Sequence, residues 1–156
     1  MMSALVTGLL ALAGVVIGVL LEPVKAFFAA SAARRAACLD QCARLIQAAT
    51  TTRPLLLAMA DRRAAGTDLL GDPSFADLVT RYRSARQEVR QSVALLHLRG
   101  SERIAAAADR LRDADRRLRA AGESEDGVAA VRVAAEALDD EIVRFAALVR
   151  TQIRTV

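Results

Sequence analysis

The chain has 156 residues, of which 22 are basic and 18 acidic, so its formal net charge is +4. It contains 8 glycines, 3 prolines and only 3% aromatic residues, a composition that excludes a turn-rich sheet protein and is typical of packed α-helices. Basic and acidic residues are interspersed and form no basic block, which argues against a nucleic-acid-binding protein.

An uncharged run of apolar and small residues, ALVTGLLALAGVVIGVLL, occupies residues 4–21. As a helix rising about 1.5 Å per residue it would span about 27 Å, close to the thickness of the hydrocarbon core of a bilayer. Glu22 and Pro23 end the run, so we predict a transmembrane anchor over residues 1–23. A cleaved signal peptide is the alternative, but it requires a basic start and a shorter apolar stretch.

Charge asymmetry around the run predicts its orientation. No basic side chain precedes it, whereas Lys25, Arg34 and Arg35 follow it. Basic residues flank the cytoplasmic end of membrane helices, so we expect the N-terminus outside the plasma (inner) membrane and the remainder of the chain in the cytoplasm. The same three side chains are candidate contacts for lipid headgroups.

Small side chains form a stripe along the predicted membrane helix. Thr7, Ala11, Gly14 and Gly18 are separated by four, three and four residues, which places them on one face. Such a face lets a second helix approach closely in lipid, so it predicts homo-oligomerisation through the anchor.

The first helix of the remaining domain, residues 24–156, is predicted from Val24 to about Arg63. We expect Pro54 to kink or interrupt it, because proline lacks an amide hydrogen and clashes with the preceding turn. Residues 66–72 read as a loop. The apolar seam of this helix, spaced mostly by threes and fours, comprises Phe28, Ser31, Cys38, Cys42, Leu45 and Ala49.

Three further helices follow in the sequence. Asp72-Pro73 is a strong helix start, Arg99-Gly100 a helix end and Ser101 a second N-cap, while residues 122–127 form the next break. The fold class is therefore all-α, an N-terminal transmembrane helix followed by an up-and-down four-helix bundle. The apolar seams comprise Phe75, Leu78, Val79, Tyr82, Val89, Val93 and Leu96, then Ile104, Ala107, Leu111, Ala114, Leu118 and Ala121, then Val128, Val131, Ala135, Leu138, Ile142, Phe145 and Val149.

Neither the cysteines nor the histidine predicts a reactive site. Cys38 and Cys42 share the apolar seam, where free cysteine behaves as a small hydrophobic residue, and a structural zinc would require further ligands. Two unpaired thiols also suit a reducing cytoplasm. His97 is the only histidine and has no identified partner for acid–base catalysis. We therefore predict no catalytic, cofactor or metal site, and no enzyme.

We predict that the charged residues of the last two helices face the solvent. Asp113 with Arg117, Asp115 with Arg119 and Asp140 with Arg144 have the spacing of surface ion pairs. The densest basic cluster, which could touch anionic lipid, is interrupted by aspartates, and this favours a solvated face. It comprises Arg110, Arg112, Arg116, Arg117 and Arg119.

Three features together resemble uncharacterised single-pass membrane proteins of high-GC actinobacteria. They are the apolar N-terminus running into FFAASAARRAA, the proline within the next helix, and the segment LLHLRGSERIAAAADRL. The resemblance implies no activity for particular residues. The chain is also similar to the membrane-anchored b subunit of rotary ATP synthases, but Pro54 and Asp72-Pro73 break the continuous stalk which that role requires.

These observations favour a membrane-tethered interaction or scaffold module without catalytic activity. Its expected partners are the bilayer, a protein partner and further copies of itself. The alternative is a small phage-type or defence-type membrane protein that oligomerises and perturbs the bilayer. A membrane-localised nucleic-acid binder is the third hypothesis and the least favoured, because the basic charge is not clustered.

Overall fold

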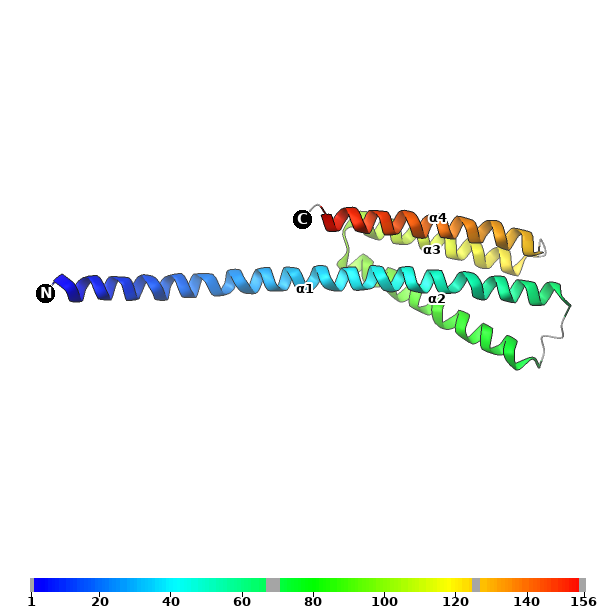
Figure 1. Ribbon diagram of the computed structural model, residues 1–156, viewed down its shortest axis with the longest axis horizontal. Helices are drawn as coiled ribbons and strands as arrows, with labels where there is room; N and C mark the ends of the chain where they lie inside the picture. The colour runs from blue at the N-terminus through cyan, green and yellow to red at the C-terminus, as the bar shows by residue number, and fades with distance from the viewer. Residues whose placement is uncertain (1, 67–70, 125–126, 155–156) are drawn as a thin grey trace. The chain divides into compact units, whose positions relative to one another are not determined.

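The described residues form four α-helices and contain no strand (Figure 1). The computed structural model describes the backbone of residues 2–66, 71–124 and 127–154, and the side chains of residues 25–66, 71–124 and 128–152. The helices are α1 (Met2–Ala64), α2 (Pro73–Arg99), α3 (Glu102–Glu123) and α4 (Gly127–Arg154). The predicted all-α class is confirmed.

The chain divides into two compact units, residues 1–37 and residues 38–156. In the second unit, the C-terminal part of α1 and the other three helices share one apolar core. The connection between α2 and α3 and the connection between α3 and α4 are short, and the chain reverses direction at each of them (Figure 1). Four helices packed as a bundle confirm the prediction for this part of the chain.

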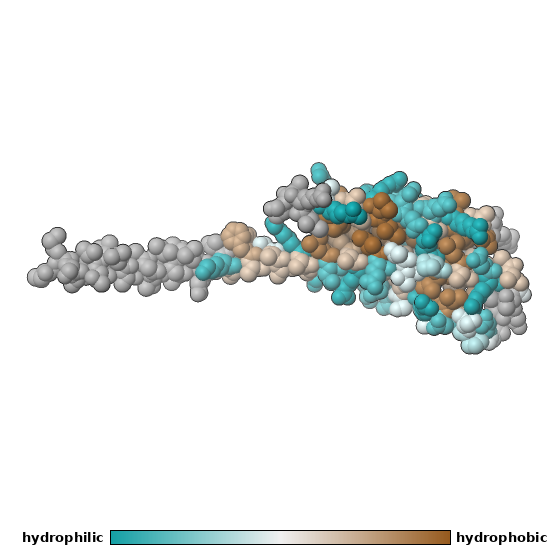
Figure 2. All heavy atoms as spheres, in the orientation of Figure 1, coloured by the Kyte–Doolittle hydropathy of each residue, from teal (hydrophilic) through white to brown (hydrophobic). Residues whose placement is uncertain are grey.

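The core of the bundle consists mainly of leucine, valine and alanine. Leu45, Leu96, Leu111, Leu138 and Phe145 are all completely buried or nearly so. Each side chain of this size stabilises the fold by about 1.5–3 kcal/mol when it is removed from water. Polar and charged side chains cover much of the visible outer face, with apolar patches between them (Figure 2).

The seams predicted for α3 and α4 form the interface between these two helices. Every predicted seam residue of both helices is buried or partly buried, and α3 packs against α2 as well as α4. The seam predicted for α1 is correct from Cys42 onward. Phe28 is an exception, because 65% of its surface is exposed.

The predicted start of α2 is confirmed in detail. Asp72 is the N-cap, Pro73 occupies the first turn, and the Ser74 amide donates a 2.9 Å hydrogen bond to the Asp72 carboxylate. Hydrogen bonds from the hydroxyl and the amide of Ser74 lower the pKa of Asp72 below its ordinary value. Arg62 at the end of α1 lies 3.2 Å from the same carboxylate, so one side chain both caps α2 and ties it to α1.

The junction between α2 and α3 also follows the prediction, with one difference. Ser101 caps α3 by accepting from the amide of Ile104. Gly100 ends α2, but its φ of −85° lies outside the left-handed region that favours glycine. Glycine fits this position because there is no room for a side chain: a β-carbon there would lie 2.6 Å from the carbonyl oxygen of Leu96.

The predicted interruption at Pro54 is wrong, since α1 is helical without a break from Met2 to Ala64. Pro54 cannot donate to the carbonyl of Thr50, but both residues are exposed, so that carbonyl can bind water. Leu55, Leu56 and Met59 just beyond the proline are buried in the core. Their burial offsets the loss of one helical hydrogen bond at the surface.

No helix in the described part of the chain combines the length and hydropathy needed to cross a bilayer. The predicted span over residues 4–21 lies outside the residues whose side chains are described. The same holds for its stripe of Thr7, Ala11, Gly14 and Gly18. Both remain predictions.

Candidate functional site

Three polar side chains from three helices are buried beside one another in the bundle. They are Thr52 of α1, Tyr82 of α2 and Asp115 of α3, with exposed fractions of 0%, 7% and 2%. Thr52 lies close enough to Asp115 for its hydroxyl to lower the pKa of Asp115, and the charge of Asp115 acts on the hydroxyl of Tyr82. We call these three residues the buried polar cluster.

The carboxylate of Asp115 lacks a full set of hydrogen-bond partners within the buried polar cluster. Its Oδ1 atom is buried and has no hydrogen-bond partner among the described residues. The hydroxyl of Thr52 donates a 2.9 Å hydrogen bond to the carbonyl oxygen of Ala49. Burial raises the pKa of Asp115, because the charged carboxylate loses its hydration, and the Thr52 hydroxyl and nearby arginines oppose this effect.

The phenol of Tyr82 is similarly isolated. Its hydroxyl oxygen is buried and finds no partner within the described part of the chain. Loss of hydration, with a smaller contribution from the negative charge of Asp115, raises the pKa of Tyr82 to about 12. Two orphan polar atoms close together in a core are unusual, since buried polar groups in native proteins are nearly always paired.

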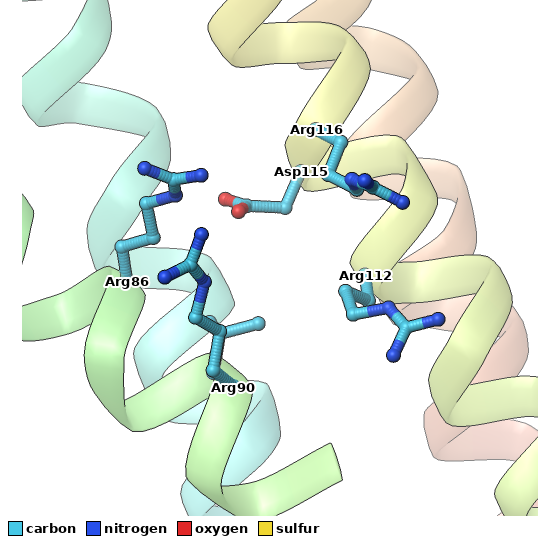
Figure 3. A pocket seen from close by; sticks show the side chains of 6 residues that line it. Arg86, Arg90, Arg112, Asp115 and Arg116 are labelled. Carbon is cyan, nitrogen blue, oxygen red and sulfur yellow. The ribbon is translucent and has the colours of Figure 1, made fainter. Parts of the chain in front are cut away.

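A pocket of about 310 Å³ opens beside the buried polar cluster, between α2 and α3. Asp115 lines it together with four arginines and one apolar residue. Figure 3 shows the guanidinium groups of Arg86 and Arg90 directed toward the carboxylate of Asp115. We call this cavity the arginine pocket, and its lining comprises Arg86, Val89, Arg90, Arg112, Asp115 and Arg116.

The four arginines differ in how far their charge is already neutralised. Arg112 lies 2.9 Å from Asp109, and Arg116 lies 3.7 Å from Asp113. Within the described residues, by contrast, neither Arg86 nor Arg90 has a carboxylate oxygen within the 4.0 Å of an ion pair. Two unneutralised guanidinium groups therefore face a carboxylate that they do not touch.

The predicted surface ion pair between Asp115 and Arg119 is wrong. Asp115 is buried, and the Nε atom of Arg119 instead lies 3.2 Å from Glu123. The signal that could have revealed this is a second row of small residues on α3, because Ala105 and Ala108 precede Asp115 at helical spacing and are also buried. α3 lies against both α2 and α4, so its buried arc is wider than one seam.

The other two predicted pairs are also replaced by closer partners. Asp113 lies within 4.0 Å of Arg112 and Arg116 and forms no ion pair with Arg117. Arg144 lies 2.7 Å from Glu141 and forms no ion pair with Asp140. Among the described residues, ion pairs three residues apart are as common as ion pairs four residues apart.

The cysteines lie where the sequence placed them, on the inner side of α1. Cys42 is buried, Cys38 is partly buried, and both are free thiols. Burial, with a smaller contribution from Cys38, raises the pKa of Cys42 to about 12. Among the described residues no three histidine, cysteine or acidic side chains gather as a metal site would require.

His97 has a partner that the sequence did not reveal. Its Nε2 atom lies 3.0 Å from the carboxylate of Asp109, which also binds Arg112. The pair joins the end of α2 to the first half of α3. It therefore acts as a link between two helices.

The basic residues proposed as lipid contacts lie on a mostly exposed stretch of α1. Lys25, Arg34 and Arg35 are all exposed. Phe27 and Phe28, at 66% and 65% exposure, stand between them with ring centroids 6.2 Å apart in an edge-to-face arrangement. The prediction of Phe28 in the core is wrong. We call residues 25–35 the interface segment.

Comparison of the chain with protein-family models, with curated proteins and with solved structures finds no match.

Proposed function

We propose that the protein is a membrane-tethered helical interaction module without catalytic activity. In this proposal residues 4–21 anchor the chain in the plasma membrane, and the bundle holds a protein partner or further copies of the chain at the cytoplasmic surface. The observation that carries the proposal is the interface segment, in which exposed phenylalanines and exposed basic residues follow an uncharged apolar run within the same helix.

The interface segment has the chemistry expected of a helix leaving a bilayer. Two exposed phenylalanines in contact with each other leave a large apolar surface in water, which is unfavourable unless another apolar phase covers it. Lys25, Arg34 and Arg35 supply positive charge, and each basic residue near an anionic leaflet contributes about 1 kcal/mol to binding. A membrane interface satisfies both features together.

Extraction of cell membranes at alkaline pH tests the anchor. We expect the wild-type chain to stay with the membrane pellet, because peripheral proteins are released under these conditions and spanning helices are not. Replacing Val16 and Ile17 with arginine should release it, since each charge at the centre of a span costs about 2.5–3.5 kcal/mol. Release of the wild-type chain would overturn the proposal.

Two further variants test whether vesicle binding depends on the phenylalanines of the interface segment or on exposed apolar residues in general. Phe27→Ser with Phe28→Ser should weaken binding of the chain to anionic vesicles. The matched control is Val133→Ser with Val143→Ser, because both valines are 68% exposed but belong to α4 of the second compact unit. An equal loss in the two variants would argue against a specific role for the phenylalanines.

Self-association and bilayer damage distinguish the proposal from its alternative. Gly14→Leu with Gly18→Leu should shift the oligomer distribution in detergent toward the monomer, whereas Ala13→Leu with Val16→Leu, on the opposite side of an ideal helix, should not. Expressing cells should keep their membrane potential. A collapsed potential would instead favour a protein that perturbs the bilayer.

A further inference from the structure

The arginine pocket, which opens between α2 and α3, carries an unbalanced charge. Arg86 and Arg90 are directed toward the carboxylate of Asp115, whereas Arg112 and Arg116 extend away from it, and their charges are already shared with Asp109 and Asp113 (Figure 3). Arg86 and Arg90 have no such partner among the described residues. The excess positive charge excludes a metal cation or an amine as the occupant and points to an anion.

A second observation narrows the chemistry of that anion. Asp115 is 2% exposed and its carboxylate points into the pocket, while its buried Oδ1 atom has no hydrogen-bond donor among the described residues (Figure 3). A fully deprotonated anion would offer the carboxylate no hydrogen atom and would place only bare, negatively charged oxygens against it. The occupant must therefore offer a hydrogen atom to Asp115 and bare oxygens to Arg86 and Arg90 at the same time.

A phosphate group that retains one proton meets both requirements. Its P–O–H donates to the carboxylate of Asp115, and its remaining oxygens accept from the planar guanidinium forks of Arg86 and Arg90. The volume of about 310 Å³ also has room for a small organic group attached to the phosphate. Sulfate has the same shape but carries no hydrogen at neutral pH, so Asp115 should discriminate against it.

We infer that the arginine pocket is a binding site for a singly protonated phosphate group, held by Arg86 and Arg90 and selected by Asp115. The inference does not depend on membrane anchoring. Inorganic phosphate, a soluble phosphomonoester and the headgroup of a phosphomonoester lipid share this chemistry. The experiment below separates these three sources.

Calorimetric titration of the full chain in a mild, uncharged detergent tests the site. We expect inorganic phosphate at pH 7.5 to bind with saturation at one site per chain, and sulfate at equal ionic strength to bind at least about tenfold more weakly. Arg86→Ala and Arg90→Ala should each weaken phosphate binding by about tenfold or more. Arg83→Ala is the matched control, because it removes an exposed arginine of α2 that does not line the pocket.

Asp115→Asn supplies the decisive variant, because it removes the negative charge and leaves the shape of the side chain. It should bind sulfate about as tightly as phosphate, since the asparagine amide can donate to a bare oxygen. Circular dichroism shows whether each variant remains folded. Equal binding of phosphate and sulfate by the wild-type chain, or equal losses in Arg83→Ala and Arg86→Ala, would overturn the inference.

Two further titrations at about pH 6 identify the source of the phosphate group. At this pH roughly half of the molecules of a phosphomonoester carry one proton. Glycerol 3-phosphate probes a soluble ester, and bicelles containing phosphatidic acid probe a lipid headgroup. Binding of either one that is lost in Arg86→Ala supports the site and identifies its source. Binding of inorganic phosphate alone supports the site with free phosphate as the ligand, and no saturable binding in any arm overturns it.

Discussion

The amide of Gly100 donates a 2.8 Å hydrogen bond to the carbonyl oxygen of Leu96, and a β-carbon on Gly100 would lie 2.6 Å from that same oxygen. The close approach allows the chain to leave α2 and begin α3 two residues later. The side chain of Ile104 lies 3.3 Å from the same position, so the turn is enclosed on both sides.

Gly100→Ala should therefore destabilise the bundle by about 1–3 kcal/mol, because the new methyl group forces the backbone apart at the junction of α2 and α3. Gly122→Ala is the matched control. A β-carbon there meets only the end of the Leu56 side chain at 3.4 Å, and alanine favours helix, so no loss of stability is expected. Urea unfolding followed by circular dichroism measures both. Equal effects of the two substitutions would contradict the steric explanation.

Pro54→Ala should stabilise the protein. The substitution restores an amide that can donate to the carbonyl of Thr50 within α1, and proline in a helix interior costs about 3 kcal/mol relative to alanine. Greater freedom of the unfolded chain offsets about 1 kcal/mol of this, which leaves a gain of about 2 kcal/mol in the free energy of unfolding.

Pro73→Ala provides the comparison for Pro54, because Pro73 lies in the first turn of α2, where the amide has no helical partner. Its replacement should change stability by less than about 0.5 kcal/mol. The same unfolding measurement applies to both variants. A loss of stability in Pro54→Ala would show that the helix depends on the proline.

Asp115→Asn should raise stability at pH 7.5 by about 1 kcal/mol in phosphate-free buffer, because a buried carboxylate without a full set of hydrogen bonds is replaced by a neutral amide. Folding raises the pKa of Asp115, so the folded state favours the protonated acid. Protonation therefore contributes stability that is complete below the pKa of the unfolded chain and is lost as the pH rises through the folded-state pKa.

The advantage of Asp115→Asn over the wild-type chain should accordingly shrink as the pH is lowered from 7.5 toward 4. Comparison of the two proteins at each pH cancels the titration of all other groups. Unfolding in urea across this range measures the difference. A difference that stays constant with pH would mean that Asp115 titrates as it does in the unfolded chain.

The two cysteines should differ in reactivity toward a thiol reagent at pH 8. Burial and the raised pKa of about 12 leave Cys42 with very little thiolate, whereas Cys38 is partly accessible. Cys42→Ala, which retains Cys38, should react at least about tenfold faster than Cys38→Ala. In denaturant the two variants should react at the same rate, which controls for the reagent. Faster reaction of Cys42 in the native protein would contradict its burial.

The ends of the helices and the main seams could be predicted because they depend on local chemistry. Asp72, Pro73 and Ser101 satisfy or avoid the free amides of a first helical turn, and this requirement is the same in every protein. The spacing of apolar residues in α3 and α4 indicates which face of each helix packs against a neighbouring helix. Both signals can be read without knowing the rest of the fold.

The arginine pocket could not be predicted, because it depends on how many neighbours a helix has. The predicted apolar seam of α3 accounts for its contact with α4. The second contact of α3, with α2, buries Asp115 and places Arg86 beside this aspartate. The continuity of α1 through Pro54 was missed for a related reason. The cost of proline is local, but the burial of Leu55 and Leu56 that offsets it comes from tertiary packing.

The position of Tyr82 gives the protein a spectroscopic probe of its own. The chain has a single tyrosine and no tryptophan, so its ultraviolet fluorescence comes almost entirely from this one phenol. The hydroxyl is buried beside Asp115, where a change of charge or hydration alters the emission. We therefore expect an anion bound beside Asp115 to change this emission, so that binding can be followed in the unmodified protein without a label or an added fluorophore.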